Sequence, residues 1–302
     1  MEFLRTPAHR FLNLPDYPFE AHHVQVGSSA GSPPLRMHYV DEGPRNGPVV
    51  LMLHGEPSWS YLYRHMIPVC VKAGQRVIAP DLIGFGKSDK PTRLEDYTYA
   101  RHVAWVRDLI AALDLRDITL VCQDWGSLIG LRLAAENEER FGRIVLGNGM
   151  LPTGEQRLPP AFKIWRAFAQ HSPWFPISGI LGVGTKRALS SRERAAYDAP
   201  FPSASFQAGA RAFPALVPAS TSDPASAANI AAWEVFSRWE KPFLLAFSDG
   251  DPITRGGDRY VSARVPGTRG QPHVTLRGGH FLQEDSPTEF ATAVNELIAR
   301  GR

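Results

Sequence analysis

The sequence predicts an α/β fold in which helices cover both faces of a mostly parallel, eight-stranded sheet. Three observations carry this prediction: short apolar runs recur along the chain, helical patterns separate them, and one long stretch interrupts the alternation. Continuous apolar runs are typical of strands buried on both faces, and the alternation of strand and helix is typical of parallel sheets. A chain of 302 residues is long enough to bury a sizeable core.

Eight segments have the character of strands. Two near the N-terminus alternate partly between polar and apolar residues, and six later segments are almost wholly apolar. We expect strands at residues 21–27, 35–42, 49–53, 76–79, 118–123, 143–146, 243–247 and 273–276. Helical spacing of apolar residues predicts helices at residues 61–72, 99–113, 127–137 and 287–300, the last of them capped by Ser286.

The alternation fails between about residues 150 and 228. This stretch is rich in Pro, Phe, Ala and Ser, and it offers helical pieces without a convincing strand. A helical cap inserted between two core strands explains the pattern, and such lids supply walls of substrate pockets. We therefore expect a core domain of residues 1–150 and 229–302, with a helical cap of residues 151–228.

The charge is nearly balanced. The chain has 33 basic and 30 acidic residues, and no run of lysine and arginine is longer than a pair. We therefore expect neither nucleic acid nor an anionic membrane as a partner. The N-terminus shows no apolar signal-peptide core and no stretch is long enough to span a membrane, so a soluble cytoplasmic protein is expected. Cys70 and Cys122 lie in a predicted helix and strand, which does not suggest a disulfide.

The most informative segment is ITLVCQDWGSLIG, at residues 118–130. Its strand ends at Gln123 and its helix begins near Ser127, so that Asp124 occupies the tight turn between them. A strained turn in this position lifts one side chain out of the top of the sheet, and in esterases that side chain is a serine. Here a carboxylate takes the serine's place.

A carboxylate at this turn suggests a particular chemistry. Because Asp124 is already ionised at neutral pH, it needs no base and attacks carbon directly, giving an ester that water must then cleave. The alternative is that Asp124 merely caps the following helix, since Asp is a favoured N-cap residue. The partners of Asp124 favour the nucleophile.

The first two partners are a base and an acid. The segment VTLRGGHFLQEDSP places His280 after the last predicted strand, where the order nucleophile, acid, histidine requires the base. The segment PFLLAFSDGDPIT offers Asp249 and Asp251 at the end of a buried strand, as the acid that orients the imidazole. We favour Asp251; the alternative is that both aspartates only form the turn.

A third partner is an oxyanion hole. The segment HGEPSWSYLYR follows the strand at residues 49–53, so the backbone N–H of Glu56 can face the tight turn at Asp124. Together with the N–H of Trp125 it would stabilise the negative charge on an oxygen of the intermediate.

With these residues in place, the chain resembles the haloalkane dehalogenases, which have the α/β-hydrolase fold, over nearly its whole length. It is most similar to the branch whose triad acid follows the strand before the last, as Asp251 does. The matching segments are HGEPSWSYLYRHMIPV from His54, DLIGFGKSDKP from Asp81, QDWGS from Gln123, AFKIW ending at Trp165 and YDAPFPSASFQAGARAFP from Tyr197.

The resemblance implies that two indole N–H groups hold the departing halide. These would be Trp125 and a cap tryptophan, for which we favour Trp165 over Trp174; ordinary packing in the cap is the alternative for Trp165. Phe162, one turn before Trp165, would line the same pocket. Glu56 would help to hold the hydrolytic water, unless it is only an exposed loop residue. The expected partners are a small apolar halogenated substrate, water and halide, with no cofactor, no metal and a monomeric chain.

Two other enzyme classes share an aspartate nucleophile at this strand-to-helix turn. An epoxide hydrolase needs an acid on the epoxide oxygen, supplied in that family by two cap tyrosines, whereas residues 150–228 contain only Tyr197 and six phenylalanines. A haloacid dehalogenase needs a cation just after the nucleophile, and the first arginine after Trp125 is Arg132. A noncatalytic binding protein is a third alternative, because a fold does not determine a function.

Overall fold

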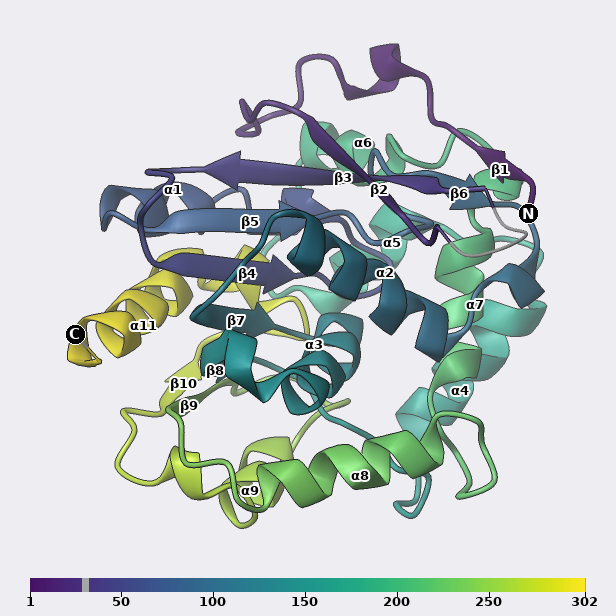
Figure 1. Ribbon diagram of the computed structural model, residues 1–302. Coiled ribbons are helices and arrows are strands. Elements are labelled where there is room, and N and C mark those ends of the chain that lie inside the picture. The colour runs from purple at the N-terminus through teal and green to yellow at the C-terminus, as the bar shows by residue number, and fades with distance from the viewer. Residues whose placement is uncertain (29–32, 302) are drawn as a thin grey trace.

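The computed structural model describes residues 1–28 and 33–301, and a twisted sheet crosses the middle of it (Figure 1). The eight strands have the order β10-β9-β8-β7-β4-β5-β3-β2. All pairs from β10 to β5 are parallel, and β3 pairs antiparallel with both β5 and β2. The bounds are β2 (His22–Val26), β3 (Leu35–Glu42), β4 (Val49–Leu53), β5 (Arg76–Pro80), β7 (Ile118–Cys122), β8 (Phe141–Leu146), β9 (Phe243–Ser248) and β10 (Val274–Leu276). The predicted α/β class and mostly parallel sheet are confirmed.

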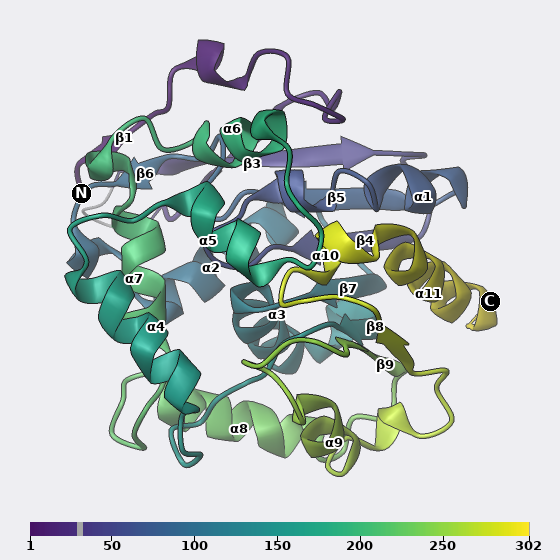
Figure 2. The ribbon, with the colours of Figure 1, turned by 180° about the vertical axis from the view of Figure 1, so that it is seen from behind.

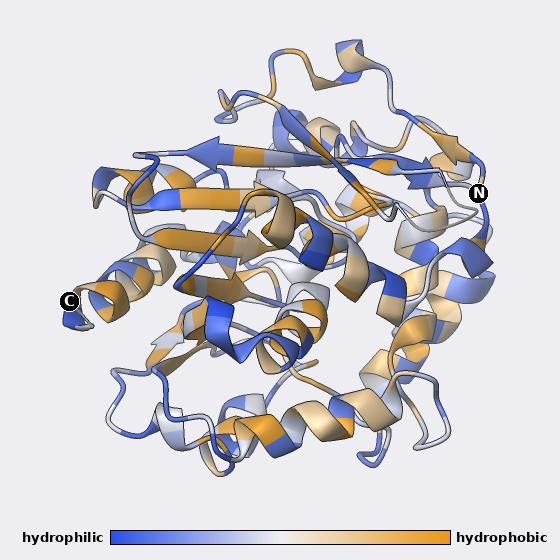
Figure 3. Cartoon of the chain, viewed as in Figure 1, coloured by the Kyte–Doolittle hydropathy of each residue, from blue (hydrophilic) through white to orange (hydrophobic). Residues whose placement is uncertain are grey.

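The apolar runs form the centre of this sheet. Every residue of β7 is buried, and Leu51 of β4 lies in register with Leu120 of β7 on one side and Ile78 of β5 on the other. By contrast, exposed and partly buried residues alternate along most of β2 at the edge. Figure 3 shows the same difference as continuous hydrophobic colour along β4 and β7. Strands buried on both faces therefore account for the unbroken apolar runs.

Helices cover both faces of the sheet (Figures 1 and 2). One face carries α1 (Ile67–Lys72) and α11 (Pro287–Arg300), and the other carries α2 (Tyr99–Ala112), α3 (Trp125–Glu136) and α8 (Ser226–Phe236). Two short helices, α9 (Gly257–Ser262) and α10 (Leu282–Asp285), follow β9 and β10. None of the helices in the described ranges combines the length and apolar character of a membrane span.

Two local predictions were wrong. The helix expected at residues 61–72 is divided into a 3₁₀ turn at Ser60–Tyr63 and the helix α1, which begins at Ile67. Pro68 stands in the first turn of α1, where its missing N–H costs no hydrogen bond. Ser286 precedes α11 but does not cap it through its side chain; its hydroxyl donates instead to the carbonyl of Arg277.

A helical region connects β8 to β9. It contains α4 (Pro160–His171), α5 (Ile177–Gly184), α6 (Ser191–Asp198) and α7 (Ala208–Leu216), followed by α8. The first four of these helices lie beyond the carboxyl ends of the parallel strands, and α8 packs along α3 beside the sheet (Figures 1 and 2). Ligand sites of open α/β sheets lie at this edge, so the helices are in the right place to close one. The division into core and cap at the expected boundaries stays a prediction.

Candidate active site

Asp124 occupies a strained turn between β7 and α3. Its backbone has φ 49° and ψ −127°, a left-handed conformation that is costly for a residue other than glycine. The turn packs closely against β4: a methyl group on Gly126 would lie 1.9 Å from the carbonyl oxygen of Leu53. The N–H of Asp124 also donates to the carbonyl of Asn148 at 3.1 Å. The surrounding chain thus holds the strained residue in place.

The two carboxylate oxygens of Asp124 face different partners. Oδ1 accepts a hydrogen bond from the backbone N–H of Glu56 at 2.7 Å, and Oδ2 lies 3.4 Å from Nε2 of His280. The carboxylate makes no capping bond to the first turn of α3, so it is not used as the helix cap of the alternative interpretation. Gly55 leaves the space for this approach, since a methyl group there would lie 2.4 Å from the Asp124 side chain.

His280 lies between Asp124 and Asp251. Its Nδ1 atom is 3.0 Å from Oδ2 of Asp251, and both residues are buried. The carboxylate of Asp251 is fixed in turn by the N–H of Ile253 at 2.9 Å and by the hydroxyl of Thr254. Asp249, the other candidate acid, instead accepts a hydrogen bond from the N–H of Gly278 at 3.0 Å. The structure therefore brings Asp124, His280 and Asp251 together and leaves Asp249 in the neighbouring turn.

Burial and charge together set the protonation of this group. Burial alone would lower the pKa of His280, but the carboxylates of Asp251 and Asp124 raise it to about 10. For Asp251 burial opposes ionisation, while His280 and Thr254 lower the pKa to about 2. Burial, and then the charge of Asp124, raise the pKa of Glu56 well above its usual value. These surroundings favour the charged form of His280 and the uncharged form of Glu56.

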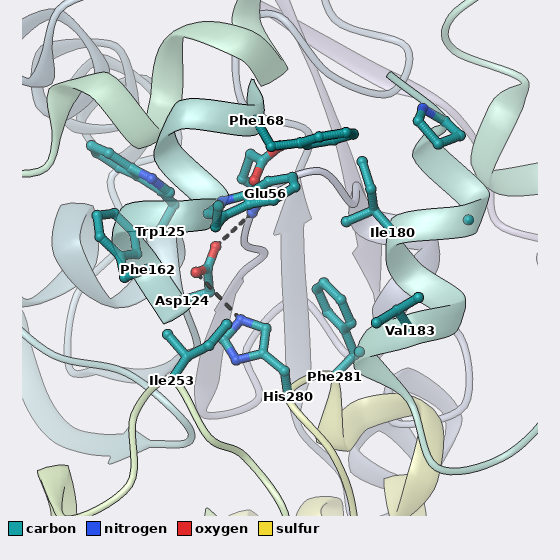
Figure 4. A pocket seen from close by; sticks show the side chains of 14 residues that line it. Glu56, Asp124, Trp125, Phe162, Phe168, Ile180, Val183, Ile253, His280 and Phe281 are labelled. Atoms are coloured by element: carbon teal, nitrogen blue, oxygen red, sulfur yellow. Dashed lines mark hydrogen bonds and ion pairs between the residues drawn. The ribbon is translucent and has the colours of Figure 1, made fainter. Parts of the chain in front are cut away.

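A cavity of about 380 Å³ opens above Asp124. Figure 4 shows the carboxylate between Phe162 and Trp125 on one side and Val183 and Phe281 on the other. Apart from the polar group at its floor, the cavity is lined mainly by apolar side chains: Trp125, Phe162, Trp165, Phe168, Pro176, Ile180, Val183, Ile253 and Phe281. Such walls fit a small apolar molecule.

Comparison with known proteins gives a consistent result. The family model of the alpha/beta hydrolase fold matches residues 48–287. A haloalkane dehalogenase of Mycolicibacterium paratuberculosis is 57% identical over 97% of each chain. A haloalkane dehalogenase of Psychrobacter cryohalolentis is 54% identical over 99% of this chain and 98% of its own. The chain belongs to the haloalkane dehalogenase family.

Solved structures of haloalkane dehalogenases share the fold. The tetrameric structure of haloalkane dehalogenase DpaA from Paraglaciecola agarilytica matches with a TM-score of 0.90 at 35% identity, covering 97% of both chains. A haloalkane dehalogenase from Bradyrhizobium elkani has a TM-score of 0.77 at 27% identity, over 93% of this chain and 98% of its own. The expected family and enzyme class are thereby confirmed, whereas the expected monomer stays a prediction.

The indoles of this dehalogenase differ in what their N–H groups contact. Those of Trp59 and Trp233 donate to backbone carbonyls, whereas those of Trp125 and Trp165 have no hydrogen-bond partner within the described residues. Trp125 stacks on Phe213 with ring centroids 4.3 Å apart, and both Trp125 and Trp165 line the cavity. Trp174 is 72% exposed and is not among the lining residues. Trp165 is therefore the better placed of the two cap tryptophans.

The residues considered for epoxide hydrolase and haloacid dehalogenase activity, Tyr197 and Arg132, do not line the cavity. The hydroxyl of the buried Tyr197 donates to the carboxylate of Glu284. No tyrosine is found among the described residues that line the cavity. Arg132 bonds to Glu136 and to Asn229, also outside the cavity. Neither side chain is placed to assist chemistry at Asp124.

The contacts of two residues, Asn148 and Gln123, with the segment around His280 were not anticipated from the sequence. The side-chain nitrogen of Asn148 donates to the carbonyls of Gly279 at 2.9 Å and of His280 at 3.0 Å. The side-chain nitrogen of Gln123 lies 3.1 Å from Nε2 of His280 and 3.2 Å from its carbonyl oxygen. Asn148 follows β8 at the same sheet edge as the other site residues, and this position is the one signal that could have identified it.

Proposed function

We propose that the enzyme hydrolyses the carbon–halogen bond of small haloalkanes through a covalent ester on Asp124, giving a primary alcohol, halide and a proton. The observation that carries the proposal is the position of the Asp124 carboxylate at the floor of an apolar cavity, 3.4 Å from His280. An ionised carboxylate attacks saturated carbon only when a leaving group departs, and halide leaves without being protonated.

In the first step, Oδ2 of Asp124 attacks the carbon that carries the halogen. Oδ1 is held by the N–H of Glu56 at 2.7 Å, which leaves the oxygen nearer His280 as the nucleophile. The new carbon–oxygen bond takes the place of the carbon–halogen bond, whose electron pair leaves with the halide. The walls beside the carboxylate are mainly apolar and give it few hydrogen-bond donors, which favours its reaction with carbon.

The departing halide would be held by the indole N–H groups of Trp125 and Trp165. Both indoles line the cavity, and neither donates to another described residue, so both donors are free for an anion. An indole nitrogen donates and cannot accept a hydrogen bond, which suits a halide. Phe162 would complete the apolar wall between them.

In the second step, water attacks the carbonyl carbon of the ester and His280 accepts its proton. Esterification removes the charge of Asp124, one of the two carboxylates that raise the pKa of His280, so His280 gives up its proton to solvent more readily and the neutral imidazole can then accept the proton of the attacking water. Asp251 stabilises the imidazolium that forms. The N–H groups of Glu56 and Trp125 stabilise the oxyanion, and the Glu56 carboxyl helps to position the water. Cleavage releases the alcohol and restores the carboxylate.

The proposal includes the architecture around the site. Residues 151–228 would act as the cap, since α4 and α5 supply Phe162, Trp165, Ile180 and Val183 to the cavity. The cavity volume of about 380 Å³ suits short haloalkanes. We keep the monomer as the expected state of this chain.

Halide and proton release from 1,2-dibromoethane or 1-bromobutane tests the proposal. We expect equal amounts of halide, proton and alcohol, and no release by the Asp124→Ala variant. Turnover of an epoxide without halide release from either bromide would favour an epoxide hydrolase. Saturable binding of both bromides without any product would favour a binding protein.

A further inference from the structure

A separate cavity of about 310 Å³ lies between the N-terminal segment and the β2–β3 edge of the sheet. Figure 1 shows the N-terminal segment, in purple, passing over this edge. Ala8, Phe11 and Ala21 give the cavity an apolar wall, and His23, Arg36 and Lys87 bring polar groups to it. None of these residues lines the active-site cavity.

Two cations at this cavity, Lys87 and Arg36, form no ion pair with a carboxylate of the described residues. The ammonium of Lys87 lies 5.6 Å from the ring centre of Phe11 and 5.1 Å from that of Tyr17, and it makes no hydrogen bond within residues 1–28 and 33–301. The ammonium of Lys90, in the same sequence motif, donates instead to the carbonyls of Gly86 and Ser88. The ammonium of Lys90 therefore has hydrogen-bond acceptors in the fold, whereas that of Lys87 contacts two aromatic rings and interacts with Asp81 only through space.

The guanidinium of Arg36 is in the same situation. Its Nε atom is buried without a hydrogen-bond partner, and no carboxylate of the described residues lies within 4.0 Å of the side chain. The nearby acids have other hydrogen-bond partners: Asp89 bonds to the side chain of Arg5 and to the backbone N–H of Arg36, and Asp81 bonds to His38 while acting on Lys87 through space. The residues outside the described ranges carry no acidic side chain.

The cavity therefore presents the cationic side chains of Arg36 and Lys87 beside the imidazole of His23. Burial, and then the charge of Arg36, lower the pKa of His23 to about 4, with further contributions from His38 and Lys87. His23 is therefore uncharged at neutral pH and can donate one hydrogen bond. Guanidinium, ammonium and imidazole together give many donors and few acceptors, so the fitting ligand is one that accepts hydrogen bonds and is negatively charged.

We propose that this cavity binds a short-chain organic carboxylate. The planar fork of Arg36 matches a carboxylate in a bidentate arrangement, and Lys87 adds a second cation on the same cavity. The apolar wall of Ala8, Phe11 and Ala21 would cover a hydrocarbon chain, which inorganic phosphate and halide lack. The site lies outside the catalytic machinery, so it is independent of the proposed reaction.

Binding at this site should strengthen the attachment of the N-terminal segment. That segment already bonds to the chain after α6: the hydroxyl of Thr6 donates to the carbonyl of Pro200 at 2.7 Å, and Arg10 donates to that of Ala199 at 3.2 Å. A carboxylate between Phe11 and the β2–β3 edge would contact both the N-terminal segment and the sheet beneath it. A ligand that binds only the folded state raises the unfolding temperature with its concentration.

Titration calorimetry and thermal unfolding with sodium butanoate test the proposal, with sodium chloride and inorganic phosphate at matched ionic strength as comparisons. We expect one saturable butanoate site per chain and a butanoate-dependent rise in the unfolding temperature. Lys87→Met and Arg36→Gln should each weaken binding by about tenfold or more. Arg116→Gln, which removes an exposed arginine paired with Asp114, should leave binding unchanged.

Three results would overturn the proposal. They are no saturable binding of butanoate to the wild-type chain, binding of butanoate to Lys87→Met and Arg36→Gln as tight as to the wild type, or tighter binding of phosphate than of butanoate. The two variants alter different elements, and retained 1-bromobutane turnover shows that each has folded. The backbone N–H of Lys87, which bonds to Asp81 at 2.7 Å, is kept in Lys87→Met.

Discussion

Nδ1 of His280 lies 3.0 Å from Oδ2 of Asp251, and the two side chains are buried together beneath the cavity. Because this contact fixes the tautomer in which Nε2 accepts a proton, Asp251→Asn should slow ester hydrolysis by on the order of 10²-fold or more. Alkylation of Asp124 should persist, so single-turnover measurements should show halide release followed by slow alcohol formation. Asp249→Asn is the matched control. Greater damage from that control than from Asp251→Asn would reverse the assignment of the acid.

Glu56 should be replaceable by its uncharged isostere. Burial and the neighbouring Asp124 raise the pKa of Glu56 well above its usual value, and Oε1 is buried without a protein partner in the described residues. Glu56→Gln keeps the shape and polarity of the protonated acid, so kcat should stay within a few-fold of the wild type. Glu56→Leu should slow the hydrolytic step by about tenfold or more. Equal losses in both variants would show that the carboxylate charge is required.

The stability of the protein should depend on pH through His280. Its pKa is raised from 6.5 to about 10 in the folded state, so folding favours the imidazolium. This contribution is complete below the unfolded-state pKa near 6.5 and is lost as the pH rises toward 10. In urea unfolding, the stability advantage of the wild type over His280→Gln should therefore shrink across this pH range. An advantage that grows with pH would mean that His280 is buried uncharged.

The two halide donors should be separable from the exposed tryptophan. Trp125→Phe and Trp165→Phe each remove the indole N–H of a residue that lines the cavity, and each should lower the rate of halide release by on the order of 10²-fold. Both should also weaken the quenching of tryptophan fluorescence by bromide. Trp174→Phe should change neither property, because Trp174 is 72% exposed and does not line the cavity. Loss of quenching in Trp174→Phe alone would identify Trp174 as the second donor.

The sequence was sufficient where local pattern determines structure. The continuous apolar runs placed the parallel strands to within a residue or two, and the strand-to-helix pattern placed Asp124 at the turn between β7 and α3. It was insufficient where the outcome depends on contacts between distant segments. The carbonyl of His280 is bonded by Asn148 and by Gln123, each more than a hundred residues away along the chain. No local spacing encodes such contacts.

The same reason limits two further predictions. The resemblance leaves both Trp165 and Trp174 as candidates, with Trp165 favoured, and only the packing of the chain places Trp165 in the wall of the cavity and leaves Trp174 72% exposed. Apolar periodicity likewise predicts one helix at residues 61–72. In the structure, Arg64 lies between the two helical pieces, is buried, and donates a hydrogen bond to Glu284. Apolar periodicity cannot predict such a contact with a distant residue.

The variant His280→Gln tests the central claim, that the substrate passes through an ester on Asp124 which His280 then helps to hydrolyse. With 1,2-dibromoethane it should release one bromide per active site as a burst and then stall. Intact-protein mass should increase by the bromoethyl group, and peptide mapping should locate that group on Asp124. His9→Gln, which alters an exposed histidine, should turn over normally. Continued turnover by His280→Gln, or an unmodified Asp124 after the burst, would contradict the two-step mechanism.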